Sequence, residues 1–237
     1  MSTLTVNPNF PLLEGPDTLR FTGKFQPHVG PIPWWGIAAC HNGTNTSSMA
    51  RCSGTWTRGL DYSLINLSTY DNSPPRLNRF QVYTLAGDIL GYGPLGHVNF
   101  TFAKGDERRT YLDTAFGDRP RVNISGVGTI TRAMRFHVGP TEEDTFVQLS
   151  VSHEDNRSPQ GYTRIRCILG WHGVFVPTDV EFLEGSRLHF KGMFDGLAQP
   201  SGRLVVEVSK ATVDHVNFLT DATSASESEI ANSNGED

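Results

Sequence analysis

The chain has 237 residues, enough for one large domain or two small ones, either with room for a hydrophobic core. Hydrophobic residues make up 37%, with 24 glycines and 14 prolines, a balance that favours short strands and turns over long helices. The formal net charge is −5, but five acids lie in residues 221–237, so residues 1–220 hold 20 basic and 20 acidic side chains. This neutral body argues against a non-specific nucleic-acid binder with a basic excess and is compatible with a local basic strip.

The three cysteines are Cys40, Cys52 and Cys167. Their odd number and the absence of CxxC spacing argue against a disulfide framework and against a zinc site. Cys167 lies in an apolar run and is expected to be a buried hydrophobe. The N-terminus lacks the charged and apolar regions of a secretory signal, and no apolar run is long enough to span a membrane. We therefore expect a cytoplasmic or nuclear protein without a membrane partner.

The first part of the chain contains one clear strand pattern. Residues 1–17 are polar and predict an extended arm, whereas Thr18–Phe25 alternates in the period-two manner of a strand with one buried face. Gln26–Gly36 is rich in proline and predicts a loop. Trp34 and Trp35 in this loop have two open interpretations, a ligand platform and a plug packed on the protein.

The middle of the chain predicts short strands separated by loops. Residues His41–Ser48 are small and polar, which predicts a loop. Further strands are expected near Cys52–Arg58, Tyr62–Ser68, Phe80–Ala86 and Val98–Phe102. Gly91–Gly96 lacks the Lys-Ser/Thr ending of a phosphate loop and predicts a tight connection between strands.

From Arg121 the strand pattern becomes more regular. Val122–Ile130 is interrupted by Gly126 and Gly128, which predict a bulge or a sharp bend. Strand patterns continue at Met134–Val138, Phe146–Ser152, Tyr162–Trp171, Ser186–Phe194 and Leu204–Ser209. Thr178–Leu183 predicts a short helix with Thr178 as its N-cap. Residues after about Thr220 are rich in Ser, Ala, Glu and Asn and predict a disordered acidic tail.

The order of these elements predicts an all-β protein with an OB-like Greek-key barrel. Five strands with a short helix between the third and the fourth are the layout of the OB-fold. Thr18–Phe25 also echoes Ser186–Phe194, so the N-terminal region is either a second, divergent barrel or a decoration of the first. The predicted organisation is a β-rich region at 1–115, the barrel at 116–218 and the acidic tail at 219–237.

Residues 121–215 resemble the single-stranded-DNA-binding-protein type of OB-fold, over about 40% of the chain. The matching segments, in order, are Val122–Gly126, Gly128–Arg132, Phe146–Val151, Thr163–Gly170 and Phe182–Gly192. The resemblance implies a barrel that binds single-stranded nucleic acid. The tail departs from the family, because it ends Asn-Gly-Glu-Asp and lacks a final apolar residue for docking partners. Residues 121–215 also hold ten basic and eleven acidic side chains, without a net basic charge.

Binding of a single strand requires aromatic platforms for the bases and cations for the phosphates. Strict alternation places Arg164 and Arg166 on one face of their strand, opposite Ile165, Cys167 and Leu169. The predicted nucleic-acid-binding residues are Arg132, Arg135, Arg164, Arg166, Trp171, Lys191 and Arg203. Phe136, Phe146 and Phe175 are further candidates for stacking. The alternative is that the phenylalanines belong to the core and the arginines form a solvated face.

No motif of an enzyme is present. The eight histidines are scattered, and neither HExxH nor Gly-x-Ser-x-Gly occurs. We predict a non-enzymatic binding module for single-stranded nucleic acid, without a cofactor, a metal or catalytic residues. One alternative is a structural or protein-interaction subunit that binds a protein or self-associates into an oligomer. The other is a carbohydrate-binding protein that uses Trp34 and Trp35.

Overall fold

A computed structural model describes residues 2–6, 15–35, 42–57, 61–69, 77–92, 97–103, 108–110, 121–139, 145–170 and 173–218. These residues form strands and their connections, without a helix, so the described part of the chain contains no helix able to cross a membrane. The short helix predicted at Thr178–Leu183 is therefore wrong. Val180–Phe182 is instead a strand, β14, because Val180 and Phe182 are buried on one side while Glu181 is exposed. It pairs with β17 (Val216–Phe218).

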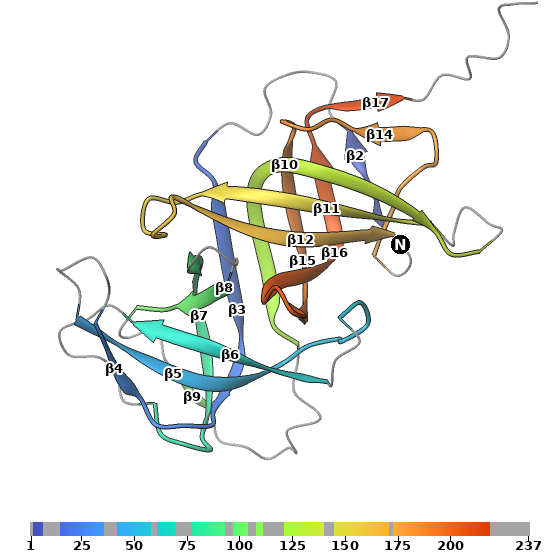
Figure 1. Ribbon diagram of the computed structural model, residues 1–237. Helices are drawn as coiled ribbons and strands as arrows, with labels where there is room; N and C mark the ends of the chain where they lie inside the picture. Colours follow the sequence, from blue (N-terminus) through green and yellow to red (C-terminus); the bar gives the residue numbers. More distant parts are fainter. Residues whose placement is uncertain are drawn as a thin grey trace, which may run out of the picture.

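The C-terminal part of the chain forms a closed five-stranded barrel (Figure 1). Its strands are β10 (Asn123–His137), β11 (Thr145–Glu154), β12 (Tyr162–Gly170), β15 (Arg187–Ala198) and β16 (Arg203–Val213). They pair in the circuit β10–β11–β12–β16–β15–β10, in which only the β12–β16 contact is parallel. This is the strand order of an OB-fold, and the predicted fold class is confirmed.

The N-terminal part repeats the same circuit of strand pairs. Its strands are β3 (Thr18–Pro27), β5 (Asn42–Arg51), β6 (Tyr62–Thr69), β7 (Val82–Tyr92) and β8 (His97–Thr101). They pair as β3–β5–β6–β8–β7–β3, again with one parallel contact, between β6 and β8. Of the two interpretations left open by the sequence, the second barrel is the one the strand pairing supports. The predicted boundaries near 115 and 219 lie outside the described residues.

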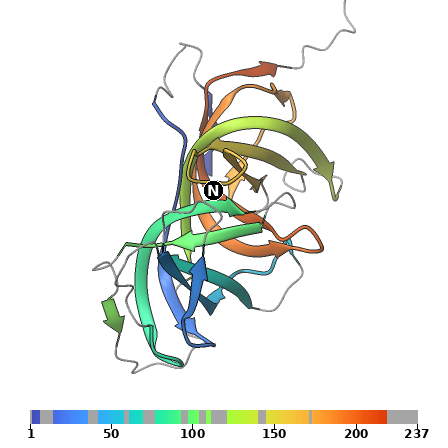
Figure 2. The same ribbon diagram turned by 60° about the vertical axis from the view of Figure 1, so that its left-hand side comes forward.

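The two barrels are joined through their first strands. β3 pairs antiparallel with the beginning of β10, with Phe21 opposite Ile124, so one continuous sheet runs through both barrels (Figures 1 and 2). β15 pairs with the same stretch of β10 from the other side, with Gly192 opposite Ile124. The sequence similarity between Thr18–Phe25 and Ser186–Phe194 is therefore a similarity between β3 and β15, the two strands that pair with the beginning of β10 from opposite sides. In the circuit the counterpart of β3 is β10.

The hydrophobic core is continuous between the barrels. Phe21, Phe25 and Phe100 of the N-terminal barrel are buried and meet edge to face, with ring centroids 5.1–6.1 Å apart. Phe100 also meets Phe194 of the C-terminal barrel at 5.8 Å. Edge-to-face pairs of this kind add about 0.5–1.5 kcal/mol each beyond the burial of their area. Packing as well as strand pairing therefore fixes one barrel against the other.

Three predictions for the N-terminal barrel are wrong. The predicted loop His41–Ser48 contains most of β5, because Thr46 and Ser48 are buried small polar residues whose alternation hydropathy does not reveal. Of the predicted strand Cys52–Arg58, residues 52–57 are described and form a connection with a turn at 55–57. The predicted loop Gln26–Gly36 contains the short strand β4 (Ile32–Trp35), which pairs with the beginning of β5.

The glycines of β10 explain how this strand bends around a buried histidine. The register of β10 against β11 shifts between Ile130 and Arg132, so the bulge lies after the two glycines and not at them, where the pairing with β15 is regular. A Cβ atom added at Gly128 would lie 2.7 Å from the ring of His153. That ring is buried, with Nδ1 2.9 Å from the carbonyl oxygen of Val127. Burial lowers the pKa of His153 to about 4, so the ring is neutral at pH 7.

Candidate nucleic-acid interface

The candidate interface is the outer face of the C-terminal barrel over β10, β11, β12 and the beginning of β16. Cross-strand register places its side chains in rows. One basic row runs from Arg132 through Ser150 to Arg166. The next contains Ser152 opposite Arg164. Since β12 and β16 are parallel, with Arg166 beside Val205, Arg203 starts its strand beside the same two rows.

The basic strip formed by Arg132, Arg164, Arg166 and Arg203 has no ion-paired acid in the part of the chain that the structure describes. Among the described residues, none of these four guanidinium groups forms an ion pair within 4.0 Å. Arg164 instead lies over the ring of Tyr162, at 4.8 Å from its centroid. Burial, and then the charge of Arg203, lower the pKa of Arg166 below its usual value, which shows that the two cations are close. Such a group of close, unpaired cations attracts an anion.

Three aromatic rings lie on the same face as the basic strip, and one outward row, Met134–Gln148–Ile168, separates the two phenylalanines from it. The rings of Phe136 on β10 and Phe146 on β11 are stacked, with centroids 4.9 Å apart and an interplanar angle of 15°. The ring of Trp56 also packs against Phe146, with the two ring centroids 4.5 Å apart and the ring planes tilted by 49°. Beneath them, Ile168, Val205 and Ala198 form a small hydrophobic cluster on the outside of the barrel, separate from the core. Phe136 is 38% exposed and can accept a further ring.

Trp56 comes from the N-terminal barrel and is held in place by a buried carboxylate of the C-terminal barrel. Asp195 on β15 is fully buried and accepts hydrogen bonds from the backbone N–H groups of Trp56 (3.1 Å) and Thr57 (2.8 Å). The hydroxyl of Ser53 donates to the same carboxylate. The backbone N–H of Gly54 donates to the carbonyl oxygen of Asp195 at 2.9 Å. We call this set of hydrogen bonds the Asp195 latch.

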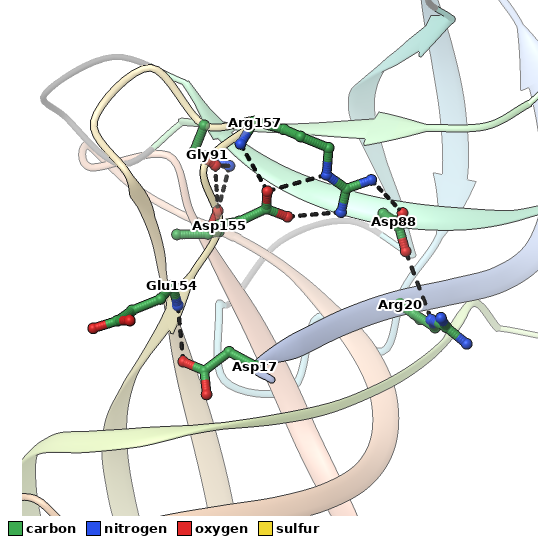
Figure 3. Close-up of polar contacts among 9 residues, drawn as sticks. Asp17, Arg20, Asp88, Gly91, Glu154, Asp155 and Arg157 are labelled. Atoms are coloured by element: carbon green, nitrogen blue, oxygen red, sulfur yellow. Dashed lines mark hydrogen bonds and ion pairs between the residues drawn. The ribbon is translucent and has the colours of Figure 1, made fainter. Parts of the chain in front are cut away.

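A second polar junction fixes the barrels on another side (Figure 3). Arg157, in the connection between β11 and β12, bonds Asp155 at 2.7 Å within its own barrel and Asp88 of β7 at 2.7 Å across the junction. The hydrogen bond with Asp155 raises the pKa of Arg157 above its usual value. Close by, the N–H of Gly91 donates to the hydroxyl of Ser158 at 3.1 Å. The connection that flanks the basic strip is thus anchored on the other barrel.

The structure brings four of the predicted site residues together, Arg132, Arg164, Arg166 and Arg203, on the same face as the predicted stacking residues Phe136 and Phe146. It places two elsewhere. Arg135 is half-buried and donates to the carbonyl oxygens of Pro177 (2.9 Å) and Val180 (2.5 Å), which indicates a structural role. Lys191 lies on β15, opposite Ser125, on a different side of the barrel.

The remaining predicted aromatic residues do not join this group in the described structure. Phe175 belongs to β13 (Val174–Phe175), which pairs with β1 (Ser2–Thr3) near the N-terminus. The side chains of Trp34, Trp35 and Trp171 lie outside the described residues. The carbohydrate interpretation of Trp34 and Trp35 therefore stays a prediction.

Sequence reasoning missed Trp56. It lies within a segment predicted as a strand, where an alternating tryptophan is ordinarily assigned to the core. The available signal was the pair of small residues, Ser53 and Gly54, directly before it, which is typical of a turn. Nothing in the local sequence indicates that the partner of this turn is Asp195, about 140 residues later.

The described cysteines are not suited to chemistry. Cys52 and Cys167 are free thiols and are buried. Burial, with smaller contributions from nearby carboxylates, raises the pKa of Cys52 to about 11, and burial also raises the pKa of Cys167. Both thiols are therefore protonated and poorly nucleophilic at neutral pH. Over the described ranges, no group of three or more His, Cys, Asp or Glu side chains is arranged to hold a metal ion.

Comparisons with known proteins found similarity at the level of structure alone. No family model matches the sequence, and no curated protein matches it significantly. The structure is similar to a deletion variant of the single-stranded DNA binding protein from Thermus aquaticus, with a TM-score of 0.45, 10% identity and coverage of 89% of this chain and 98% of that chain. It is also similar to a murine DNA binding protein bound to double-stranded DNA, with a TM-score of 0.23, 7% identity and coverage of 83% and 97%.

Proposed function

We propose that the protein is a non-enzymatic binding module for single-stranded nucleic acid, with the strand lying across β10, β11, β12 and the beginning of β16. One observation carries the proposal: the exposed ring of Phe136, stacked on Phe146, lies on the same face as four arginines that form no ion pair with a described acid. Stacking of bases on aromatic rings and attraction of phosphates by cations are the two contributions that such binding needs.

The position of this surface on the fold supports the proposal. Oligonucleotide ligands of OB-folds bind across the second and third strands, which are β11 and β12 in this circuit. Arg164 and Arg166 lie on β12, and Phe146 lies on β11. Sequence-tolerant binding is expected, since stacking and phosphate contacts read no base edges.

A salt titration with a fluorescent oligothymidylate of about 8 nucleotides, within the ~4–16 nucleotides of one OB-fold, tests the proposal. The double variant Arg164→Gln/Arg166→Gln removes two phosphate contacts. We expect it to weaken binding at least about tenfold at low salt and to reduce the slope of log K against log salt by about 1.4. The matched control is Arg79→Gln, an exposed arginine of the N-terminal barrel that lies over Phe80.

Two outcomes would reject the proposed function. One is the absence of oligonucleotide binding by the wild-type protein at low salt, where phosphate contacts are strongest. The other is an equal loss of affinity in Arg164→Gln/Arg166→Gln and in Arg79→Gln. Such a result would show that binding depends on the overall charge of the protein and not on the position of the arginines. Circular dichroism of each variant confirms that the barrel is folded before binding is measured.

A further inference from the structure

We infer that a second row of cations, on another side of the C-terminal barrel, holds the phosphates of the same strand after it leaves the first face. This inference rests on the proposed function. The second row is Arg20 on β3, Ser125 on β10, Lys191 on β15 and Lys210 on β16. Cross-strand register makes these four residues consecutive neighbours across four strands. We call them the reverse-side row.

The two lysines of the reverse-side row face each other without compensation. Lys191 and Lys210 are directly opposite in the register of β15 and β16, and both are exposed. Like charges in this position destabilise a sheet. In the part of the chain that the structure describes, neither lysine forms an ion pair within 4.0 Å. A bound anion between them would remove the repulsion that the folded protein otherwise carries.

Arg20 extends the row and is only weakly engaged. Its Nε lies 3.7 Å from Asp88, and its side chain is 71% exposed. Arg157 holds the same carboxylate much more closely, at 2.7 Å. Arg157 therefore neutralises most of the charge of Asp88, and the guanidinium group of Arg20 stays available to a phosphate. Figure 3 shows Arg20 and Arg157 reaching Asp88 from opposite sides.

The surface around the row is hollowed, which suits an extended chain. A depression of about 530 Å³ is lined by Arg20, Asn123, Ser125 and Lys191 among others, and a second of about 340 Å³ by Thr5, Lys191, Lys210 and Thr212 among others. Lys191 lines both, so the two depressions meet at the row. Their hydroxyl and amide groups are donors for phosphate and sugar oxygens.

The same strands connect the two faces. Arg203 begins β16 on the first face and Lys210 lies seven residues later on the same strand, about 23 Å at 3.3 Å per residue. A stacked single strand covers that distance in about seven nucleotides at ~3.4 Å each. A strand whose first ~8 nucleotides lie on the first face needs about seven more to reach Lys210, so an oligonucleotide of about 8 nucleotides held on that face stops short of the reverse-side row, whereas one of about 25 nucleotides can reach both.

The test compares oligothymidylates of about 8 and about 25 nucleotides on the variant Lys191→Gln/Lys210→Gln. We expect the affinity of the long strand to fall about tenfold and its salt slope to fall by about 1.4, since two phosphate contacts are lost. The affinity of the short strand should stay within about twofold of wild type. Arg79→Gln again controls for overall charge, and thermal unfolding confirms that the variant is folded.

The outcomes separate this inference from the proposed function. If wild type binds both oligonucleotides and the lysine variant binds the long one with unchanged affinity and slope, the reverse-side row is rejected while the proposed function stands. If the lysine variant loses the short strand as strongly as the long one, the second face is also rejected, because the lysines would then belong to the first. If wild type binds neither oligonucleotide, both proposals are rejected.

Discussion

The two barrels have the same circuit of strand pairs but different outer faces. On the C-terminal barrel, the second and third strands place Ser150 opposite Arg166 and Ser152 opposite Arg164. On the N-terminal barrel, the corresponding strands β5 and β6 place Ser47 opposite Asn66 and Met49 opposite Leu64. These two rows hold two arginines on the C-terminal barrel and none on the N-terminal barrel, where Leu64 is 58% exposed and Arg51 lies in the next row, opposite Tyr62. The comparison teaches that the strand order supplies a platform and that the outward residues decide what it binds.

The barrels also differ in what they contribute to the shared interface. The N-terminal barrel supplies Trp56, and the C-terminal barrel supplies Phe136, Phe146 and the carboxylate that positions the tryptophan. The aromatic stack is therefore complete only when the barrels are docked. Four experiments, from the largest expected effect to the smallest, test the division between the barrel proposed to bind and the barrel that supports it.

Breaking the Asp195 latch should have the largest effect. Asp195→Ala leaves the N–H groups of Trp56 and Thr57 and the hydroxyl of Ser53 without their buried acceptor. We expect a loss of about 3 kcal/mol in the free energy of unfolding, since hydrogen bonds to a buried charged group are lost together. Urea denaturation measures it. Asp195→Asn keeps one acceptor oxygen and should lose less, whereas a wild-type midpoint for Asp195→Ala would show that the latch is not stabilising.

Acid should weaken the C-terminal barrel through His153. The pKa of histidine is 6.5 in the unfolded chain and about 4 for His153 in the folded protein. Between these values the unfolded state binds more protons, so stability is fully present above about pH 6.5 and falls by about 3 kcal/mol as the pH drops to about 4.

The measurement for His153 is urea unfolding at pH 7 and pH 4.5 for wild type and His153→Gln. The variant should lose much less stability on acidification than wild type. His189→Gln is the matched control, because His189 is an exposed histidine on β15. Equal acid sensitivity in all three proteins would contradict the role assigned to the buried ring.

A methyl group should be tolerated differently in the two barrels. Gly128→Ala on β10 places a Cβ atom 2.7 Å from the ring of His153, and we expect a loss of about 2 kcal/mol from overpacking. Gly30→Ala in the N-terminal barrel meets no atom within 4 Å and should change stability by less than about 0.5 kcal/mol. Thermal unfolding compares the two variants, and equal midpoints would show that the fit around His153 is loose.

Removing one exposed apolar side chain from each outer face should have the smallest effect, and oligonucleotide affinity should distinguish the two faces. Phe136→Ala removes the exposed end of the aromatic stack, and we expect about 1 kcal/mol of lost oligonucleotide affinity, about fivefold, with little change in stability. Leu64→Ala on the N-terminal barrel removes a more exposed side chain and should leave affinity unchanged. If both variants lose oligonucleotide affinity to the same extent, the two faces share the ligand and the division between the barrels is wrong.

Much of the C-terminal barrel could be predicted because its strands alternate strictly. Phe146–Ser152 and Tyr162–Trp171 were predicted as strands and correspond to β11 and β12, with Ile165, Cys167 and Leu169 inside and Arg164 and Arg166 outward. The N-terminal barrel was harder, because β5 buries small polar side chains such as Thr46 and Ser48 in place of large apolar ones. A period of two in hydropathy is visible only where the buried positions are apolar.

The sequence by itself determined which residues alternate, and so the all-β class, the order of the strands in the C-terminal barrel and the outward direction of Arg164 and Arg166. Tertiary structure alone decided which outward residues meet. Register across β10, β11 and β12 brought Arg132 and Arg166 into one row on either side of Ser150, and closure of the barrel carried Lys191 to another side. The Asp195 latch brought Trp56 onto Phe146. Alternation is a local property of one strand, whereas register, closure and docking depend on pairings between residues far apart in the chain.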